Sequence, residues 1–231
     1  MTLTNTYENA RKVSLLAYNG HEMDGMHILQ GYNTGAAYYD SELQGVILKS
    51  NMTFDGEKHR GYYGYTTVNL PPDGYDATEN AFVGPYGSLA HPKALVRGGC
   101  TNNDGVGEKL AAALQKDLVL KPKESVCVIF VCGVAFTREK VLEIRNNYTP
   151  EQCEKSLNAV REKFANQISL VSISTPDEKL NEMFPWLKHQ TNMGSRWARV
   201  RSNGYRDMLS DTDCLACFNP VLALERFERI W

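Results

Sequence analysis

Short apolar runs with alternating polar positions fill the first 150 residues of the chain. The runs are rich in β-branched and aromatic residues, and Gly, Asn or Pro residues separate them. Strands are therefore predicted over residues 2–5, 11–18, 36–39, 45–48, 60–68, 118–120 and 125–134. A strand with one apolar face buries it against a second sheet, so the pattern predicts an antiparallel β-sandwich.

The apolar spacing changes to three or four residues after Thr149. Thr149 fits a helix N-cap and Pro150 fits the first turn, and apolar residues with helical spacing follow over 153–164. A short strand is predicted next, over 168–173.

Two more helices are predicted in the last third of the chain. The segment 175–178 repeats the start signal of a helix whose apolar residues run to Met193, with Pro185 as a potential break or kink. A final helix begins at Pro220 and reaches Trp231 with no Gly, Asn or Pro to end it. We therefore expect the natural chain to continue past Trp231, whereas the pattern leaves open whether Met1 is its true start.

Composition and charge exclude several classes of partner. The formal net charge is −2 and the isoelectric point is about 6.2, which gives no general attraction to nucleic acid or anionic membranes. No apolar run approaches the roughly 18 residues that span a bilayer, and the first residues do not resemble a signal peptide. We expect a cytoplasmic protein that binds neither nucleic acid nor a membrane.

The six cysteines do not form a metal or redox motif in the sequence. Cys127 and Cys132 lie in an apolar run and are predicted to be core residues. Cys214 and Cys217 have the spacing of a zinc or redox pair, but no second pair or nearby histidine completes a ligand set. No metal and no cofactor is expected.

Two arginines and two aspartates surround a Gly-Tyr turn in the segment 201–211. Guanidinium groups donate several hydrogen bonds and carboxylates accept them, so this combination fits recognition of a polyhydroxylated ligand. A solvated charge run at the start of a helix is an equally good interpretation of the residue types alone.

The order of several motifs resembles the glycoside hydrolase family 94 phosphorylases along nearly the whole chain. The motifs that resemble the family's N-terminal sandwich are Phe82–Tyr86, His91–Pro92, Val96–Gly98, Gly105–Leu114 and Val126–Gly133. Those that resemble its linker and the entry to its catalytic barrel are Ser174–Asp177, Trp186–Gln190, Ser195–Ala198 and Gly204–Asp207.

This resemblance implies a mainly β fold in which a sandwich precedes an (α/α)6 barrel that holds the active site. The expected divisions are a β-sandwich over 1–173, a helical linker over 174–199 and the first part of the barrel over 200–231.

The resemblance also implies roles for four residues, and we infer a role for a fifth, Arg206. Arg201 and Asp207 match residues that bind the non-reducing sugar on the donor side of the cleaved bond. Arg206 is expected to order their loop by pairing with a carboxylate. Asp211 matches a second acidic position, where sugar binding and helix capping are both open. Arg196 matches a further subsite arginine, although the stretch between Arg196 and Arg201 is shorter than in the family.

The implied reaction is inverting phosphorolysis of β-linked oligosaccharides. A carboxylic acid protonates the glycosidic oxygen while inorganic phosphate, the co-substrate, attacks the anomeric carbon from the opposite face. In the family the general acid and the phosphate-binding residues lie further along the chain, so we expect them beyond Trp231 and expect residues 1–231 alone to be inactive. Oligosaccharides or sugar phosphates are the implied ligands, and a homodimer is the implied assembly. A transferase, a related hydrolase and a non-catalytic carbohydrate-binding sandwich remain alternatives.

Overall fold

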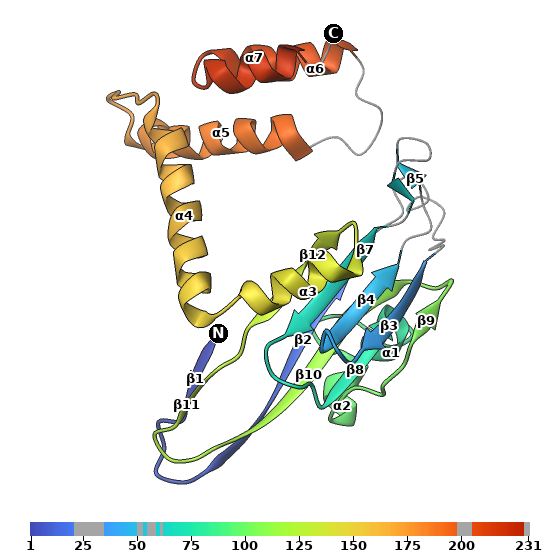
Figure 1. The fold of residues 1–231 in the computed structure, drawn as a ribbon. Helices are drawn as coiled ribbons and strands as arrows, with labels where there is room; N and C mark the ends of the chain where they lie inside the picture. Colours follow the sequence, from blue (N-terminus) through green and yellow to red (C-terminus); the bar gives the residue numbers. More distant parts are fainter. Residues whose placement is uncertain (21–34, 50–52, 55–58, 61, 198–204, 229–231) are drawn as a thin grey trace. The chain divides into compact units, whose positions relative to one another are not determined.

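The structure is a computed structural model that describes residues 1–20, 35–49, 53–54, 59–60, 62–197 and 205–228. These residues form two compact units, Met1–Cys153 and Glu154–Trp231 (Figure 1). No described helix has the length and apolar character needed to cross a bilayer.

The first unit is built on two antiparallel sheets that face each other. The smaller sheet has the order β2-β10-β8, and the larger has the order β12-β7-β4-β3-β9. The strands of the smaller sheet are β2 (Arg11–Gly20), β8 (Gly74–Thr78) and β10 (Leu110–Leu120). Those of the larger sheet are β3 (Ala36–Asp40), β4 (Gly45–Lys49), β7 (Tyr63–Val68), β9 (Gly105–Val106) and β12 (Phe130–Ala135). Two two-stranded ribbons add β1 (Thr2–Thr4) with β11 (Ser125–Cys127) and β5 (Thr53–Phe54) with β6 (His59–Arg60).

The main core fills the space between the two sheets. Alternate residues of β3, β4, β7, β8 and β10 supply it: Ala37, Val46, Leu48, Val68, Ala77, Leu110, Ala112 and Leu114. This arrangement confirms the predicted antiparallel sandwich for the first unit.

Three short helices cover the outer faces of the sheets. Phe82 of α1 (Glu79–Phe82) and Ala94 of α2 (Lys93–Arg97) pack with Ala113 of β10 on the smaller sheet. Val141 of α3 (Arg138–Asn147) packs on the larger sheet with Ile47. The sequence analysis did not predict these helices.

The predicted strand 125–134 is two strands, because its halves pair with different partners. Its first half, β11, pairs with β1, and its second half, β12, pairs with β7. Between them, Asn69 donates its backbone N–H to the carbonyl of Ile129 (3.1 Å) and accepts from the N–H of Ile129 on its side chain (2.8 Å). These two hydrogen bonds satisfy the backbone between β11 and β12, where strand pairing is interrupted.

The second unit consists of helices. They are α4 (Pro150–Ser169, whose first turn belongs to the first unit), α5 (Glu178–Trp197), α6 (Tyr205–Ala216) and α7 (Pro220–Glu228). The start signal of α4 is confirmed, because the N–H of Gln152 donates to the Thr149 hydroxyl at 3.3 Å. Helix α5 continues through Pro185. The predicted strand 168–173 was wrong: α4 extends to Ser169, and no strand follows it among the described residues.

Candidate functional site

The candidate sugar-binding residues lie around the junction of α5 and α6. Arg201 falls outside the described residues. Arg196 belongs to the last turn of α5, and Asp207 and Asp211 belong to α6, but their side chains are not among those described. Arg206 lies in the first turn of α6 with an exposed side chain. The proximity of these side chains to one another therefore stays a prediction.

Helix α6 is held by an apolar contact with α7. Leu215 of α6 is fully buried against Leu222 and Ala223 of α7, and Phe218 packs on the same cluster from the connecting turn. This contact fixes the side of α6 that faces α7.

A chain of polar contacts joins α5 to the turn before α7. Asn192 of α5 is buried and donates from Nδ2 to the carbonyl of Lys188 (3.0 Å). Its Oδ1 accepts from Nδ2 of Asn219 at 3.2 Å. The side chain of Asn219 in turn caps α7 by accepting from the N–H of Leu222 at 3.2 Å. Buried polar groups of this kind specify one arrangement of the helices, because any other arrangement leaves them unpaired.

Lys188 is a buried cation that the sequence analysis did not identify. Its side chain is 2% exposed, and Nζ donates to the carbonyls of Ile168 and Val171 and lies 5.0 Å from the ring centroid of Phe184. These carbonyls belong to the end of α4 and the segment after it. Lys188 therefore ties α5 to the segment where a strand was predicted, which is a structural role.

The cysteines show no catalytic or metal-binding arrangement among the described residues. Cys214 and Cys217 are exposed on and just after α6, and no group of three metal-ligating side chains occurs in the described part of the chain. Burial, helped by the nearby Asp76 carboxylate, raises the pKa of the Cys100 thiol to about 12, which keeps it protonated. The prediction that Cys132 is a core residue was wrong, because it is exposed on β12, and Cys127 is half-buried.

Tyr63 and Tyr65 of β7 pack in an apolar cluster and do not form an exposed platform on which a sugar could stack. Tyr65 is buried against Ile47 and Val141, and Tyr63 packs on the same cluster. Both point toward the outer face of the larger sheet that α3 covers.

Comparison with known proteins identifies the first unit. A family model described as the glycosyl hydrolase 94 supersandwich domain matches residues 1–151. The chain is 26% identical over 230 residues to a solabiose phosphorylase of Paenibacillus borealis, covering 99% of this chain and 30% of that protein. It is 23% identical over 241 residues to an N,N'-diacetylchitobiose phosphorylase of Vibrio furnissii, covering 97% of this chain and 29% of that protein.

A third relative is also named as a phosphorylase. It is the 3-O-β-D-glucopyranosyl-β-D-glucuronide phosphorylase of Paenibacillus borealis, 28% identical over 237 residues that cover 97% of this chain and 30% of that protein. The chain thus spans about 30% of the length of the curated relatives that it matches. With a supersandwich match over most of its length and a sandwich of two antiparallel sheets, the chain belongs to glycoside hydrolase family 94.

Proposed function

We propose that residues 1–231 are part of an inverting glycoside phosphorylase that cleaves β-linked oligosaccharides with inorganic phosphate. The main support is the extent of the similarity. The supersandwich match ends at residue 151, yet the alignments with three phosphorylases continue through the helices and cover at least 97% of the chain. A protein related to them only through its sandwich would lose this similarity after α3.

The residues that carry the proposal are the arginines and aspartates near the start of α6. Arg201 and Asp207 bind hydroxyls of the non-reducing sugar, with Arg196 beside them and Arg206 ordering the segment. Asp211 lies one helical turn after Asp207, on the same side of α6, because residues four apart share a helix face. Because α6 begins at Tyr205, Asp211 is an interior helix residue and does not cap the N-terminus of α6, so in this proposal it binds the sugar.

The general acid and the phosphate-binding groups belong, in this proposal, to residues outside 1–231. The acid transfers its proton to the glycosidic oxygen as the bond from that oxygen to the anomeric carbon breaks. A phosphate oxygen forms the new bond on the opposite face of the sugar ring. Phosphate is itself the nucleophile, so no second carboxylate is needed to activate water.

The assay is phosphate release from α-glucose 1-phosphate with glucose or cello-oligosaccharides as acceptors. We expect no release by residues 1–231 alone, and release by the product of the coding sequence read on past Trp231. In that longer product, Asp207→Ala is expected to reduce kcat/KM by about 10- to 150-fold, the effect of losing a charged hydrogen bond to a sugar hydroxyl in the transition state. Turnover by residues 1–231, or full activity of Asp207→Ala, contradicts the proposal.

A homodimer is a further proposal for the longer protein, and light scattering tests it.

A further inference from the structure

A pocket of about 280 Å³ opens at one end of the sandwich, within the first unit. It lies where β3 of the larger sheet faces β8 of the smaller sheet, and its lining comprises Tyr39, Pro72, Asp73, Gly74, Tyr75 and Asn102. This volume is at the lower end of the range for small-molecule sites, which is about 300 Å³, so the pocket has room for one small ring.

Two stacked tyrosines form the apolar wall of the pocket. Tyr39 lies two residues after the core residue Ala37 on β3, and Tyr75 lies two residues before the core residue Ala77 on β8, so both continue the inner faces of their sheets. Their ring centroids are 4.9 Å apart and their planes differ by 20°. Both side chains are partly exposed. An accessible aromatic surface of this kind packs well against the C–H face of a sugar ring.

The tyrosines are held in place by Asp104. Its Oδ1 accepts from the hydroxyl of Tyr75 at 3.1 Å and from the backbone N–H of Tyr39 at 3.2 Å. Burial, and then the hydrogen bond to Asp104, raises the pKa of Tyr75, so its hydroxyl keeps its proton. The stacked pair is therefore fixed before any ligand enters, which lowers the entropic cost of binding.

Asn102 supplies a positioned amide at the rim. Its backbone is left-handed (φ 58°), and it pairs with Tyr75 in both directions: its N–H donates to the Tyr75 carbonyl (2.8 Å), and its Oδ1 accepts from the Tyr75 N–H (3.0 Å). This leaves Nδ2 of Asn102 to donate to a ligand. The preceding residue, Thr101, is anchored by two hydrogen bonds to the buried carboxylate of Asp76. A non-glycine residue held in this conformation by its surroundings is typical of binding sites.

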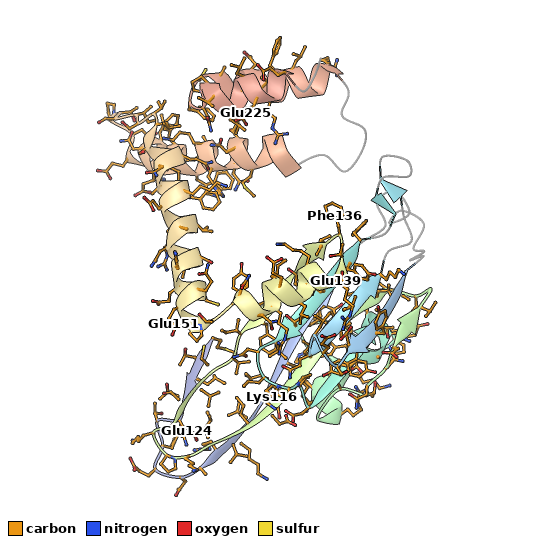
Figure 2. The ribbon with its side chains drawn as sticks, in the orientation of Figure 1. Lys116, Glu124, Phe136, Glu139, Glu151 and Glu225 are labelled. Carbon is orange, nitrogen blue, oxygen red and sulfur yellow. The ribbon has the colours of Figure 1, made fainter. Side chains whose placement is uncertain are left out.

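The charges around the pocket favour an uncharged ligand. Asp73 at the rim is paired with Lys116 of β10 at 2.8 Å (Lys116 is labelled in Figure 2), and Asp104 adds a second carboxylate. Burial opposes ionisation of Asp73, but hydrogen bonds from Lys116 and from the N–H of Asp117 outweigh it and lower its pKa. Among the described residues, no arginine, lysine or histidine lines the pocket. A phosphate group would meet carboxylates here, whereas sugar hydroxyls would find both acceptors and donors.

We propose that this pocket is a carbohydrate-binding site that takes one uncharged pyranose unit of an oligosaccharide, packed against the exposed part of the Tyr39–Tyr75 pair and hydrogen-bonded to Asn102 and Asp73. The site belongs to the first unit and uses none of the residues proposed near α6. Its role rests on the proposed function: it concentrates the neutral oligosaccharide substrate on the protein and discriminates against the sugar phosphate.

The structural alternative is that the tyrosine pair only closes the end of the core. The two interpretations predict different effects of substitutions on the affinity for sugars. Tyr39→Ala removes half of the stacking surface. Asn102→Gly removes the rim amide and suits the left-handed backbone, because glycine adopts positive φ without strain. Tyr86→Ala is the matched control, because Tyr86 is a fully exposed tyrosine that also has positive φ but does not line the pocket.

The experiment is a ligand-observed NMR titration of the 231-residue protein with methyl β-glucopyranoside, cellobiose and α-glucose 1-phosphate. We expect millimolar binding of the two neutral sugars, as is usual for a single ring in a small pocket, and weaker binding of the sugar phosphate. Tyr39→Ala is expected to weaken binding of the neutral sugars by at least about tenfold and Asn102→Gly by about fivefold, while Tyr86→Ala retains the parent affinity. Circular dichroism confirms that each variant is folded.

Three results would overturn the proposal. They are no binding of either neutral sugar, unchanged affinity in folded Tyr39→Ala and Asn102→Gly, and binding of α-glucose 1-phosphate that Tyr39→Ala weakens and that is tighter than the binding of the neutral sugars. The titration involves no turnover, so its outcome is independent of whether the longer protein proves to be a phosphorylase.

Discussion

Asp76→Ala is expected to destabilise the first unit by about 3–5 kcal/mol, because it removes a fully buried carboxylate that anchors the loop after α2. Asp76 Oδ1 accepts from the N–H of Thr101 at 2.7 Å and from its hydroxyl at 2.6 Å. Oδ2 lies 3.4 Å from a guanidinium nitrogen of Arg97. Each hydrogen bond to a charged group contributes about 1.5–3 kcal/mol, and alanine leaves both Thr101 donors without their acceptor.

Two variants divide this loss into parts. Asp76→Asn keeps a side-chain oxygen for Thr101 but turns an amide toward Arg97, so we expect a loss of about 1–2 kcal/mol. Thr101→Val removes only the hydroxyl that donates to this carboxylate and is expected to cost about 1.5–3 kcal/mol. The loss should therefore be largest for Asp76→Ala, which removes the acceptor of both Thr101 donors.

Urea unfolding followed by two signals measures these losses. All three tryptophans, Trp186, Trp197 and Trp231, belong to the second unit, so tryptophan fluorescence follows that unit and the strand signal in circular dichroism follows the first. The Asp76 variants should shift only the circular dichroism transition. Equal losses for Asp76→Ala and Asp76→Asn would refute the role of the carboxylate oxygens, and an equal shift of the fluorescence transition would refute independent units.

Three further outcomes are expected. Two hydrogen bonds from the Arg138 guanidinium outweigh burial and lower the pKa of Asp40 below its usual value. The stabilising effect of ionised Asp40 is therefore complete above about pH 5 and is lost as the pH falls through the lowered pKa. In Asp40→Asn, the free energy of unfolding should therefore fall less steeply as the pH is lowered. Gly45→Ala should cost at least about 2 kcal/mol, because a Cβ would overlap the backbone of β7, whereas Gly20→Ala, with ordinary contacts of 3.6 and 3.9 Å, should be nearly neutral in urea unfolding. Lys188→Met leaves two carbonyls without their donor and should lower the free energy of unfolding by about 2–4 kcal/mol, which lowers the urea midpoint of the fluorescence transition. An unchanged midpoint would contradict the buried role of Lys188.

The strands with one buried face could be predicted from the sequence. The apolar and polar alternation located β2 and β3 to within about two residues, because each packs one face on the core. Strand β4 was located by its short continuous apolar run, since both of its faces are buried. The start of β10 was missed. Residues 110–115 are buried on both faces, between the larger sheet and helices α1 and α2, so their sequence shows no alternation.

Helix starts were predictable where a capping residue precedes a long apolar stripe. Thr149 marked α4 in this way. Helix α3 has the same signal, since the N–H of Lys140 donates to the Thr137 hydroxyl at 3.2 Å, but the helix has only ten residues and one buried side chain, so its periodicity is weak. Pro185 lies inside α5 and does not end it, so a proline alone did not mark a helix boundary here.

The candidate sites differ in how the sequence reveals them. The residues 201–211 are contiguous, so a motif identified them, whereas the sandwich pocket combines Tyr39, Tyr75 and Asn102 from three separate segments. The packing of the larger sheet on the smaller one brings Tyr39 and Tyr75 together, and the turn that carries Asn102 pairs with Tyr75. Neither tyrosine by itself carries a local signal of binding.

The stereochemistry of the reaction tests the central proposal most directly. The product of the coding sequence read past Trp231 would be incubated with a β-linked disaccharide and inorganic phosphate, and the sugar phosphate formed would be identified by ¹H and ³¹P NMR. Inverting phosphorolysis predicts an α-sugar 1-phosphate in an amount equal to the sugar released. A β-sugar 1-phosphate, or free sugars with no sugar phosphate, would contradict the assignment of this chain to an inverting phosphorylase.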